Sequence, residues 1–291
     1  MKIVNILGGL GNQMFEYAMF LALKHAHPEE EIKVCTRSFG GYRLHNGLEI
    51  QRIFGVELPE ASLWDLCKLA YPFFNYKSWQ FVRHCLPSRK TMTRGALNIP
   101  FIFSEIDRPS STYYEGYWQN EKNFRHIRQK VLREFSFPPF NDIRNIQLSE
   151  RILNCESLSC HIRRGDYLKN LDWSVCSMEY YDDAMAKMFR DHKIDLVCLF
   201  SDDIEWCRSK FGNNYDNREI VYVDWNKGLS SYCDMQLISL CKYNIIANSS
   251  FSWWGAWLGR REGKVVYAPD RWLNAEVLNS PICDSWVKIH V

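Results

Sequence analysis

The chain has 291 residues, enough for one large domain or two compact ones. Its 36 Lys and Arg nearly balance 34 Asp and Glu, and a net charge of +2 argues against a nucleic-acid partner. The 11 Cys include no Cys-x-x-Cys pair, so we expect reduced thiols and neither a zinc site nor a redox motif. No leader and no apolar run of membrane-spanning length is visible, which predicts a cytoplasmic protein with at most peripheral membrane contact.

Short apolar runs alternate with amphipathic ones, a pattern typical of an α/β protein with parallel sheets. In the first half we predict strands at 2–7 and 32–35, and helices at 12–25, 122–135 and 142–154. The stretch from about 40 to 112 is irregular and aromatic. In the second half we predict strands at 158–162, 196–200, 220–223, 244–247 and 265–267, and helices at 179–190, 204–211, 232–241 and 251–258. This pattern predicts two Rossmann-like domains, 1–155 and 156–291, facing across a ligand cleft at the carboxyl ends of their strands.

A glycine-rich segment, residues 8–14 (GGLGNQM), follows the first strand and opens the first helix. Glycines there let a phosphate approach the backbone, and a helix N-terminus favours negative charge. The dinucleotide fingerprint needs a glycine where Met14 stands, and no acid ends the second strand, where residues 35–37 read CTR. An NADP-type oxidoreductase is therefore disfavoured but stays open, as does a tight turn that binds nothing.

The segment 161–167 (HIRRGDY) closes a strand in the second half. Arg163 and Arg164 offer planar, bidentate donors for a pyrophosphate, and His161 shares the strand face of Arg163. Asp166 is placed either to orient an arginine or to accept a proton. A surface salt-bridge cluster is the alternative, while an adhesion role for Arg-Gly-Asp is disfavoured at a strand end.

Three further features complete the candidate site. The run 248–258 (NSSFSWWGAWL) combines N-cap residues with a helix start, which makes an anion site, although a capped core helix explains its tryptophans equally well. Asp202 and Asp203 follow a strand, and Asp234 opens a helix. A carboxylate such as Asp234 can read the N1–H and N2–H₂ edge of guanine, and helix capping is the alternative. The chain contains no Asp-x-Asp triplet, so we expect arginines rather than a metal to stabilise a diphosphate.

These motifs, in this order, resemble the α-1,2-fucosyltransferases of glycosyltransferase family 11. The resemblance rests on residues 8–15, 116–119 (GYWQ), 161–167, 200–203 (FSDD) and 249–255 (SSFSWWG), and spans nearly the whole chain except about 55–112. It implies a GT-B fold, a GDP-β-L-fucose donor, a galactose-containing acceptor, inversion to an α-1,2 linkage, and neither metal nor other cofactor. The residues expected to bind the donor are Gly11, Asn12, Gln13, His161, Arg164, Asp202, Asp234, Ser249, Ser250, Phe251 and Ser252.

The resemblance also implies the catalytic roles. Arg163 would hold the β-phosphate as charge develops on it, and Asp166 matches the position of a general base, with Asp172 the next candidate. Three alternatives stay open: a GDP-fucose transferase of another linkage or acceptor, the oxidoreductase, and a protein that binds a sugar nucleotide without catalysis.

Overall fold

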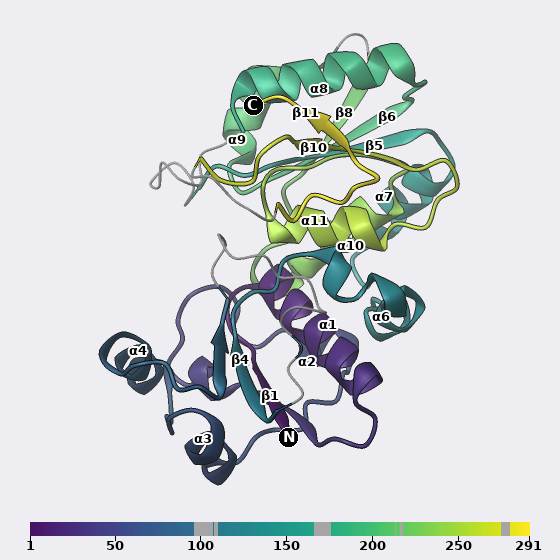
Figure 1. Cartoon of the computed structure of the whole chain (residues 1–291). Helices are drawn as coiled ribbons and strands as arrows, with labels where there is room; N and C mark the ends of the chain where they lie inside the picture. Colours follow the sequence, from purple (N-terminus) through teal and green to yellow (C-terminus); the bar gives the residue numbers. More distant parts are fainter. Residues whose placement is uncertain (96–106, 108–109, 166–175, 213, 216–217, 275–279) are drawn as a thin grey trace. The chain divides into compact units, whose positions relative to one another are not determined.

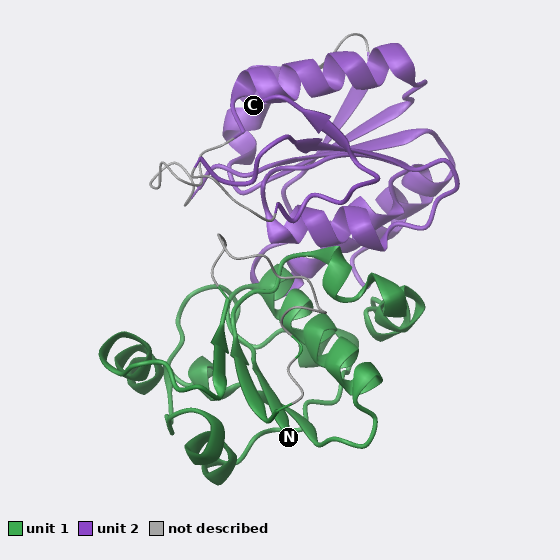
Figure 2. Ribbon diagram, viewed as in Figure 1, with its two compact units in different colours: residues 1–138 green, residues 139–291 purple. Residues whose placement is uncertain are grey.

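The computed structural model describes residues 1–95, 107, 110–165, 176–212, 214–215, 218–274 and 280–291. The chain divides into two compact units, Met1–Pro138 and Pro139–Val291 (Figure 2). The division comes earlier than the boundary predicted near residue 155. Helix α7 (Ile143–Leu153) belongs to the second unit because its Leu148 and Ile152 are buried in the core of that unit.

The first unit is built on a parallel sheet of order β2-β1-β4-β3. Helix α1 covers one face of this sheet, and α3 and α4 cover the other (Figure 1). The strands are β1 (Lys2–Asn5), β2 (Ile32–Cys35), β3 (Met92–Arg94) and β4 (Thr112–Glu115). The helices are α1 (Leu10–Ala26), α2 (Ile50–Phe54), α3 (Leu63–Leu69), α4 (Tyr76–Cys85) and α6 (Arg128–Glu134).

Two parts of the first unit differ from the prediction. Helices α3 and α4 occupy the stretch expected to be irregular, and each begins with a capping box, Ser62 with Asp65 and Asn75 with Ser78. The helix predicted at 122–135 is instead two 3₁₀ turns, Glu121–Asn123 and Arg125–Ile127, followed by α6. Local side-chain hydrogen bonds compete with helix formation here, because the Asn120 side chain accepts from the Lys122 N–H at 2.9 Å.

The second unit holds a seven-stranded sheet of order β11-β10-β9-β5-β6-β8-β7. All its pairs are parallel except β7 with β8. The strands are β5 (Ser157–Ile162), β6 (Leu196–Ser201), β7 (Asn214–Tyr215), β8 (Arg218–Val223), β9 (Tyr243–Ile245), β10 (Val265–Pro269) and β11 (Val287–Ile289). The helices besides α7 are α8 (Met178–Asp191), α9 (Ile204–Phe211), α10 (Tyr232–Leu240) and α11 (Ser250–Leu258).

The strand order of the second unit reverses between β5 and β9. The chain moves outward from β5 through β6 to β8, then returns to place β9 on the other side of β5. In open α/β sheets, ligands bind outside the carboxyl ends of the strands at such a switch point. The predicted motifs at 161–167, 200–203 and 248–252 all follow the strands that meet here.

Candidate active site

The carboxyl ends of β5, β6 and β9 bring together residues that lie far apart in the sequence. His161, at the end of β5, packs its ring against Phe251 in the first turn of α11, with centroids 5.8 Å apart. Arg163, just past β5, forms an ion pair with Asp202, just past β6, at 3.1 Å between Nη1 and Oδ2. The switch point of the second unit therefore carries the predicted histidine, arginine and helix N-terminus as one cluster.

The two neighbouring arginines are held by different partners. The Asp202 carboxylate pairs with Arg163 through Oδ2 and accepts from the Arg164 backbone N–H through Oδ1 at 2.9 Å. The Arg164 guanidinium instead pairs with Asp203 at 3.3 Å and stacks over the Trp206 ring, 3.6 Å from its centroid. Stacking and ion pairing fix the plane of a guanidinium, so both arginines are pre-oriented.

The two neighbouring aspartates also separate in role. Asp203 caps α9, since its side chain accepts from the Trp206 N–H, so the capping alternative holds for this residue. Asp202 orients Arg163 instead. A Cβ on Gly165 would lie 2.6 Å from Asp202 Oδ2, so a larger residue here would displace the carboxylate that pairs with Arg163. Asp166 and Asp172, the candidate bases, lie outside the described residues.

His161 is a buried imidazole with one ring nitrogen that still requires a partner. Burial and the neighbouring Arg163 lower the pKa of His161 to about 4, although Asp202 opposes the shift, so the ring is neutral at pH 7. Its Nδ1 is buried, and the described residues supply no hydrogen-bond partner for it. Buried polar atoms are nearly always paired, so this nitrogen fits a hydrogen bond to a bound ligand.

The serines at the start of α11 differ in role and in burial. The Ser249 side chain caps the helix by accepting from the Phe251 N–H at 3.3 Å. The Ser252 hydroxyl lies within 3.3 Å of the Ala247 carbonyl and is buried, so it holds the preceding loop. Ser250 is half-buried at the first position of the helix. The first turn still presents the backbone N–H groups that favour an anion.

Asp234, half-buried at the start of α10, joins a polar network whose asparagines are buried. Its Oδ1 accepts from Asn226 Nδ2 at 2.8 Å, and Asn226 exchanges hydrogen bonds with Asn145 of α7 at 2.7 and 3.0 Å. Trp225 Nε1 donates to Asn145 Oδ1 at 2.7 Å. Burial raises the pKa of Asp234 to about 7, with the Asn226 bond opposing the shift. The carboxyl is thus positioned by Asn226 and poised between its two protonation states.

In the first unit, a side chain from another segment holds the glycine loop. Gly8 has a φ of +95°, a conformation suited to glycine, and Gly11 is buried in the first turn of α1. Asn12 is half-buried, and its Oδ1 accepts from Gln119 Nε2 at 2.7 Å. This bond ties the GYWQ motif to the loop, a pairing that the sequence did not predict.

Gln13 is a positioning residue for this loop. Its amide donates to the Gly8 and Gly47 carbonyls at 2.8 and 2.7 Å and accepts from the Glu49 and Ile50 N–H groups at 2.8 and 3.2 Å. These four bonds use the full hydrogen-bonding capacity of a glutamine side chain. Gln13 therefore shapes the loop, and its direct contact with a donor substrate stays a prediction.

Unusual backbone conformations also flank the glycine loop. Among the described residues, His45 and Trp118 are the non-glycine residues with positive φ, at 58° and 51°. The His45 ring lies 3.2 Å from where a Cβ on Gly9 would be, and Tyr117 contacts Gly8 in the same way at 3.4 Å. Such conformations cost about 1–3 kcal/mol each and cluster at functional sites. The glycine loop is therefore the candidate site of the first unit.

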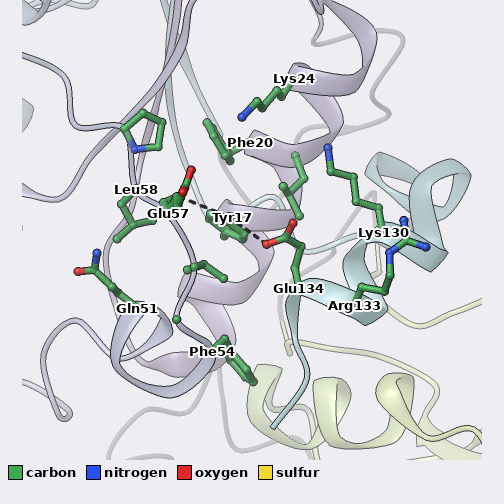
Figure 3. Close-up of a pocket in the computed structure, with 14 residues that line it drawn as sticks. Tyr17, Phe20, Lys24, Gln51, Phe54, Glu57, Leu58, Lys130, Arg133 and Glu134 are labelled. Carbon is green, nitrogen blue, oxygen red and sulfur yellow. Dashed lines mark hydrogen bonds between the residues drawn. The ribbon is translucent and has the colours of Figure 1, made fainter. Parts of the chain in front are cut away.

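A separate pocket of about 730 Å³ opens in the first unit between α1, α6 and residues 55–59 (Figure 3). The Tyr17 hydroxyl at its centre lies 3.4 Å from Glu134 Oε2 and from the Glu57 carbonyl. Lys24 and Arg133 are among its other lining residues. Its lining includes none of the residues predicted to bind the donor. Over the described part of the chain, no group of three His, Cys, Asp or Glu side chains forms a metal site.

The sequence profile of glycosyl transferase family 11 matches residues 101–290. The chain belongs to this family. An α-1,2-colitosyltransferase of Escherichia coli is 33% identical over 99% of this chain and 98% of its own length. The galactoside 2-α-L-fucosyltransferase SEC1 of Bos taurus is 26% identical over 91% of this chain and 65% of its own. The resemblance to family 11 drawn from the motifs is confirmed, and the protein is a glycosyltransferase.

Solved structures support the fold. The fucosyltransferase NodZ from Bradyrhizobium matches with a TM-score of 0.51 and 15% identity, over 89% of this chain and 92% of that one. This likeness and the two parallel sheets identify an α/β fold of the GT-B class, as predicted. In the described part of the chain, none of the helices is both long and apolar enough to cross a bilayer.

The roles of some residues at these sites were not predicted from the sequence. Gln119 lies in a motif that indicated only the family, and no local pattern marks His45. Asn145 did have a signal, because it shares the buried face of α7 with Leu148 and Ile152 at helical spacing. A polar side chain on an apolar helix face indicates a buried hydrogen-bond network.

Proposed function

We propose that this family 11 glycosyltransferase transfers L-fucose from GDP-β-L-fucose to the 2-hydroxyl of a galactoside, with inversion. The observation that carries the proposal is the cluster at the switch point of the second unit. There Arg163 is fixed by Asp202 beside the N-terminus of α11 and the unpartnered His161 Nδ1. This arrangement presents a cation, helix N–H groups and a buried polar atom to an anionic ligand.

Arg163 would stabilise the leaving group. As the bond from the fucose anomeric carbon to the β-phosphate breaks, negative charge grows on the phosphate oxygens. A guanidinium already oriented by Asp202 stabilises that charge without having to reorganise, and the helix N–H groups of α11 add to it. Cations of the chain would then replace a divalent metal, so we expect transfer to continue in excess EDTA; loss of activity that Mn²⁺ restores would contradict this.

The guanine and the acceptor would be handled by other groups. Ionised Asp234, held by Asn226, accepts hydrogen bonds from the N1–H and N2–H₂ groups that adenine lacks. Asp166 takes the proton from the acceptor hydroxyl while that oxygen attacks the face opposite the diphosphate, and no protein nucleophile is needed. Gly11 and Asn12 of the glycine loop, with Asn12 held by Gln119, stay predicted donor-binding residues.

Colitose is a second candidate for the sugar transferred. It is L-fucose without the 3-hydroxyl, and an α-1,2-colitosyltransferase is 33% identical to this chain. The leaving-group chemistry and the linkage are the same for both sugars, so the residues above serve either donor. Only contacts to the 3-hydroxyl distinguish the two, and a missing hydroxyl penalises a site built to bind it.

The test is a product analysis. The enzyme is incubated with GDP-fucose or GDP-colitose and a panel of β-galactosides, and the new linkage is determined by NMR. An α-1,2-linked fucosyl galactoside supports the proposal. Preferred use of GDP-colitose favours the second candidate. GDP binding without transfer from either donor to any galactoside would refute the proposed donor and acceptor.

A further inference from the structure

We propose that the outer surface of α3 and α4 in the first unit docks the protein on an anionic membrane surface. Three large aromatic side chains lie on it, Trp64, Phe74 and Phe81, and 69%, 67% and 62% of their surfaces are exposed. Among the described residues, no other Trp or Phe side chain is exposed. Apolar groups of this size at the surface mark a contact site when they gather in one place. We call residues 64, 68, 74, 77 and 81 the aromatic–basic face.

The fold turns this face outward. Helices α3 and α4 cover the same face of the sheet, and their inner residues, such as Trp79, are buried in the core beneath (Figure 1). Lys77 and Phe81 are four residues apart, so they share the side of α4 opposite to Trp79. Phe74 precedes the helix, and its N–H donates to the Ser78 hydroxyl at 2.9 Å, which holds it on the first turn.

The positive charge of the protein is concentrated around this face. Residues 61–95 contain six Lys and Arg and a single acid, Asp65, whose carboxylate already pairs with Lys33 at 2.8 Å. The rest of the chain has 30 Lys and Arg against 33 Asp and Glu, a net charge of −3. The overall value of +2 therefore conceals an excess of five positive charges in this stretch of sequence, of which Arg83 and Arg94 pair with the buried Glu115 of β4. The basic residues are Lys68, Lys77, Arg83, Arg89, Lys90 and Arg94.

Exposed aromatic rings interleaved with lysines match the boundary of an anionic bilayer. Trp and Phe insert among the lipid headgroups while the lysines attract anionic lipid, and both contribute to peripheral binding. Lys68 Nζ lies 5.6 Å from the Trp64 ring centre, so one site offers both contacts. With ten residues, α4 is too short to cross the bilayer and fits in its interfacial plane. Charge complementarity selects anionic lipid as the partner.

The test is sedimentation of the full-length protein with phosphatidylcholine vesicles, with and without phosphatidylglycerol. We expect binding only to the anionic vesicles, weakened by salt. Replacing Trp64, Phe74 and Phe81 together by Ser should lower the partition coefficient by about tenfold or more. Replacing Lys68 and Lys77 by Glu should remove the preference for phosphatidylglycerol. Each substitution should lower the partition coefficient on anionic vesicles by about fivefold or more.

A matched control replaces Ile143 and Leu229 of the second unit by Ser. These side chains are 61% and 62% exposed, so the variant loses comparable exposed apolar groups elsewhere and should bind vesicles like the wild type. Absence of wild-type binding, or equal loss in the control, would overturn the proposal. Displacement of the protein from vesicles by single-stranded RNA at equal charge would also overturn it. So would light scattering that shows an oligomer of the wild type and a monomer of the aromatic variant. Vesicle binding requires no sugar nucleotide, so this result is independent of the proposed reaction.

Discussion

The raised pKa of Asp234 makes a quantitative prediction about nucleotide binding. If the ionised carboxylate reads guanine, GDP affinity follows the ionised fraction of Asp234. With a pKa of about 7, that fraction falls from about nine-tenths at pH 8 to about one-tenth at pH 6. We therefore expect GDP affinity, measured by calorimetry, to fall about tenfold over this range. ADP carries the same diphosphate without the guanine edge, so the ratio of GDP to ADP affinity isolates Asp234 from phosphate titration.

Asp234→Asn should remove this pH dependence. The variant keeps the size of the side chain but loses a charge-assisted hydrogen bond worth about 1.5–3 kcal/mol, or about 10- to 150-fold in GDP affinity at pH 8. Asp224→Asn is the matched control, because Asp224 lies in the β8–α10 loop that carries Asn226, and it pairs with Arg208 at 2.7 Å instead of with Asn226. Equal losses for GDP and ADP, or an unchanged pH dependence, would refute guanine reading by Asp234.

The raised pKa of Asp234 also predicts that the stability of the protein changes with pH in the direction opposite to GDP affinity. Because the folded pKa lies above the ordinary value of 3.8, the folded protein holds a proton that the unfolded chain has lost between about pH 4 and pH 7. The contribution of Asp234 to stability therefore declines as pH rises through this window and stays low above it. Asn mimics the protonated acid, so Asp234→Asn without nucleotide should melt higher than wild type at pH 8 and similarly at pH 4. A variant that melts lower at pH 8 would show that burial is not the cause of the shift.

Three other outcomes follow from the second unit. Arg163→Lys keeps the charge but loses the planar fork, so kcat should fall about 10²–10³-fold in a variant that circular dichroism shows to be folded; near-normal turnover would remove Arg163 from the mechanism. Asp166→Asn should lower transfer about 10²–10⁴-fold while GDP affinity is kept, whereas a collapse of GDP affinity would move the base elsewhere, with Asp172 next. Gly255→Ala places a Cβ 2.6 Å from Ile238 Cγ2 between α10 and α11, so urea unfolding should show a loss of about 1–3 kcal/mol, and an unchanged midpoint would contradict this close approach.

The sequence by itself determined the fold class and the family. The apolar runs that became β5, β6, β9 and β10 are almost wholly buried strands, and such strands are recognisable because both their faces are covered. Glycines, arginines and serines directly after strands marked the edge where ligands bind. These are local signals, legible within a few residues. Helices α3 and α4 also had such signals in their capping boxes, although aromatic composition obscured them.

Only the tertiary structure assigned roles to chemically similar neighbours. Asp202 and Asp203 are adjacent carboxylates, yet one orients Arg163 from across the sheet and the other caps its own helix. Likewise Trp79 is buried while Phe81 is exposed, because α4 turns one side toward the sheet. The raised pKa of Asp234 follows from burial beside α7, a helix some 80 residues away in sequence. Contacts between distant segments create these differences, and no pattern within a short stretch of sequence contains them.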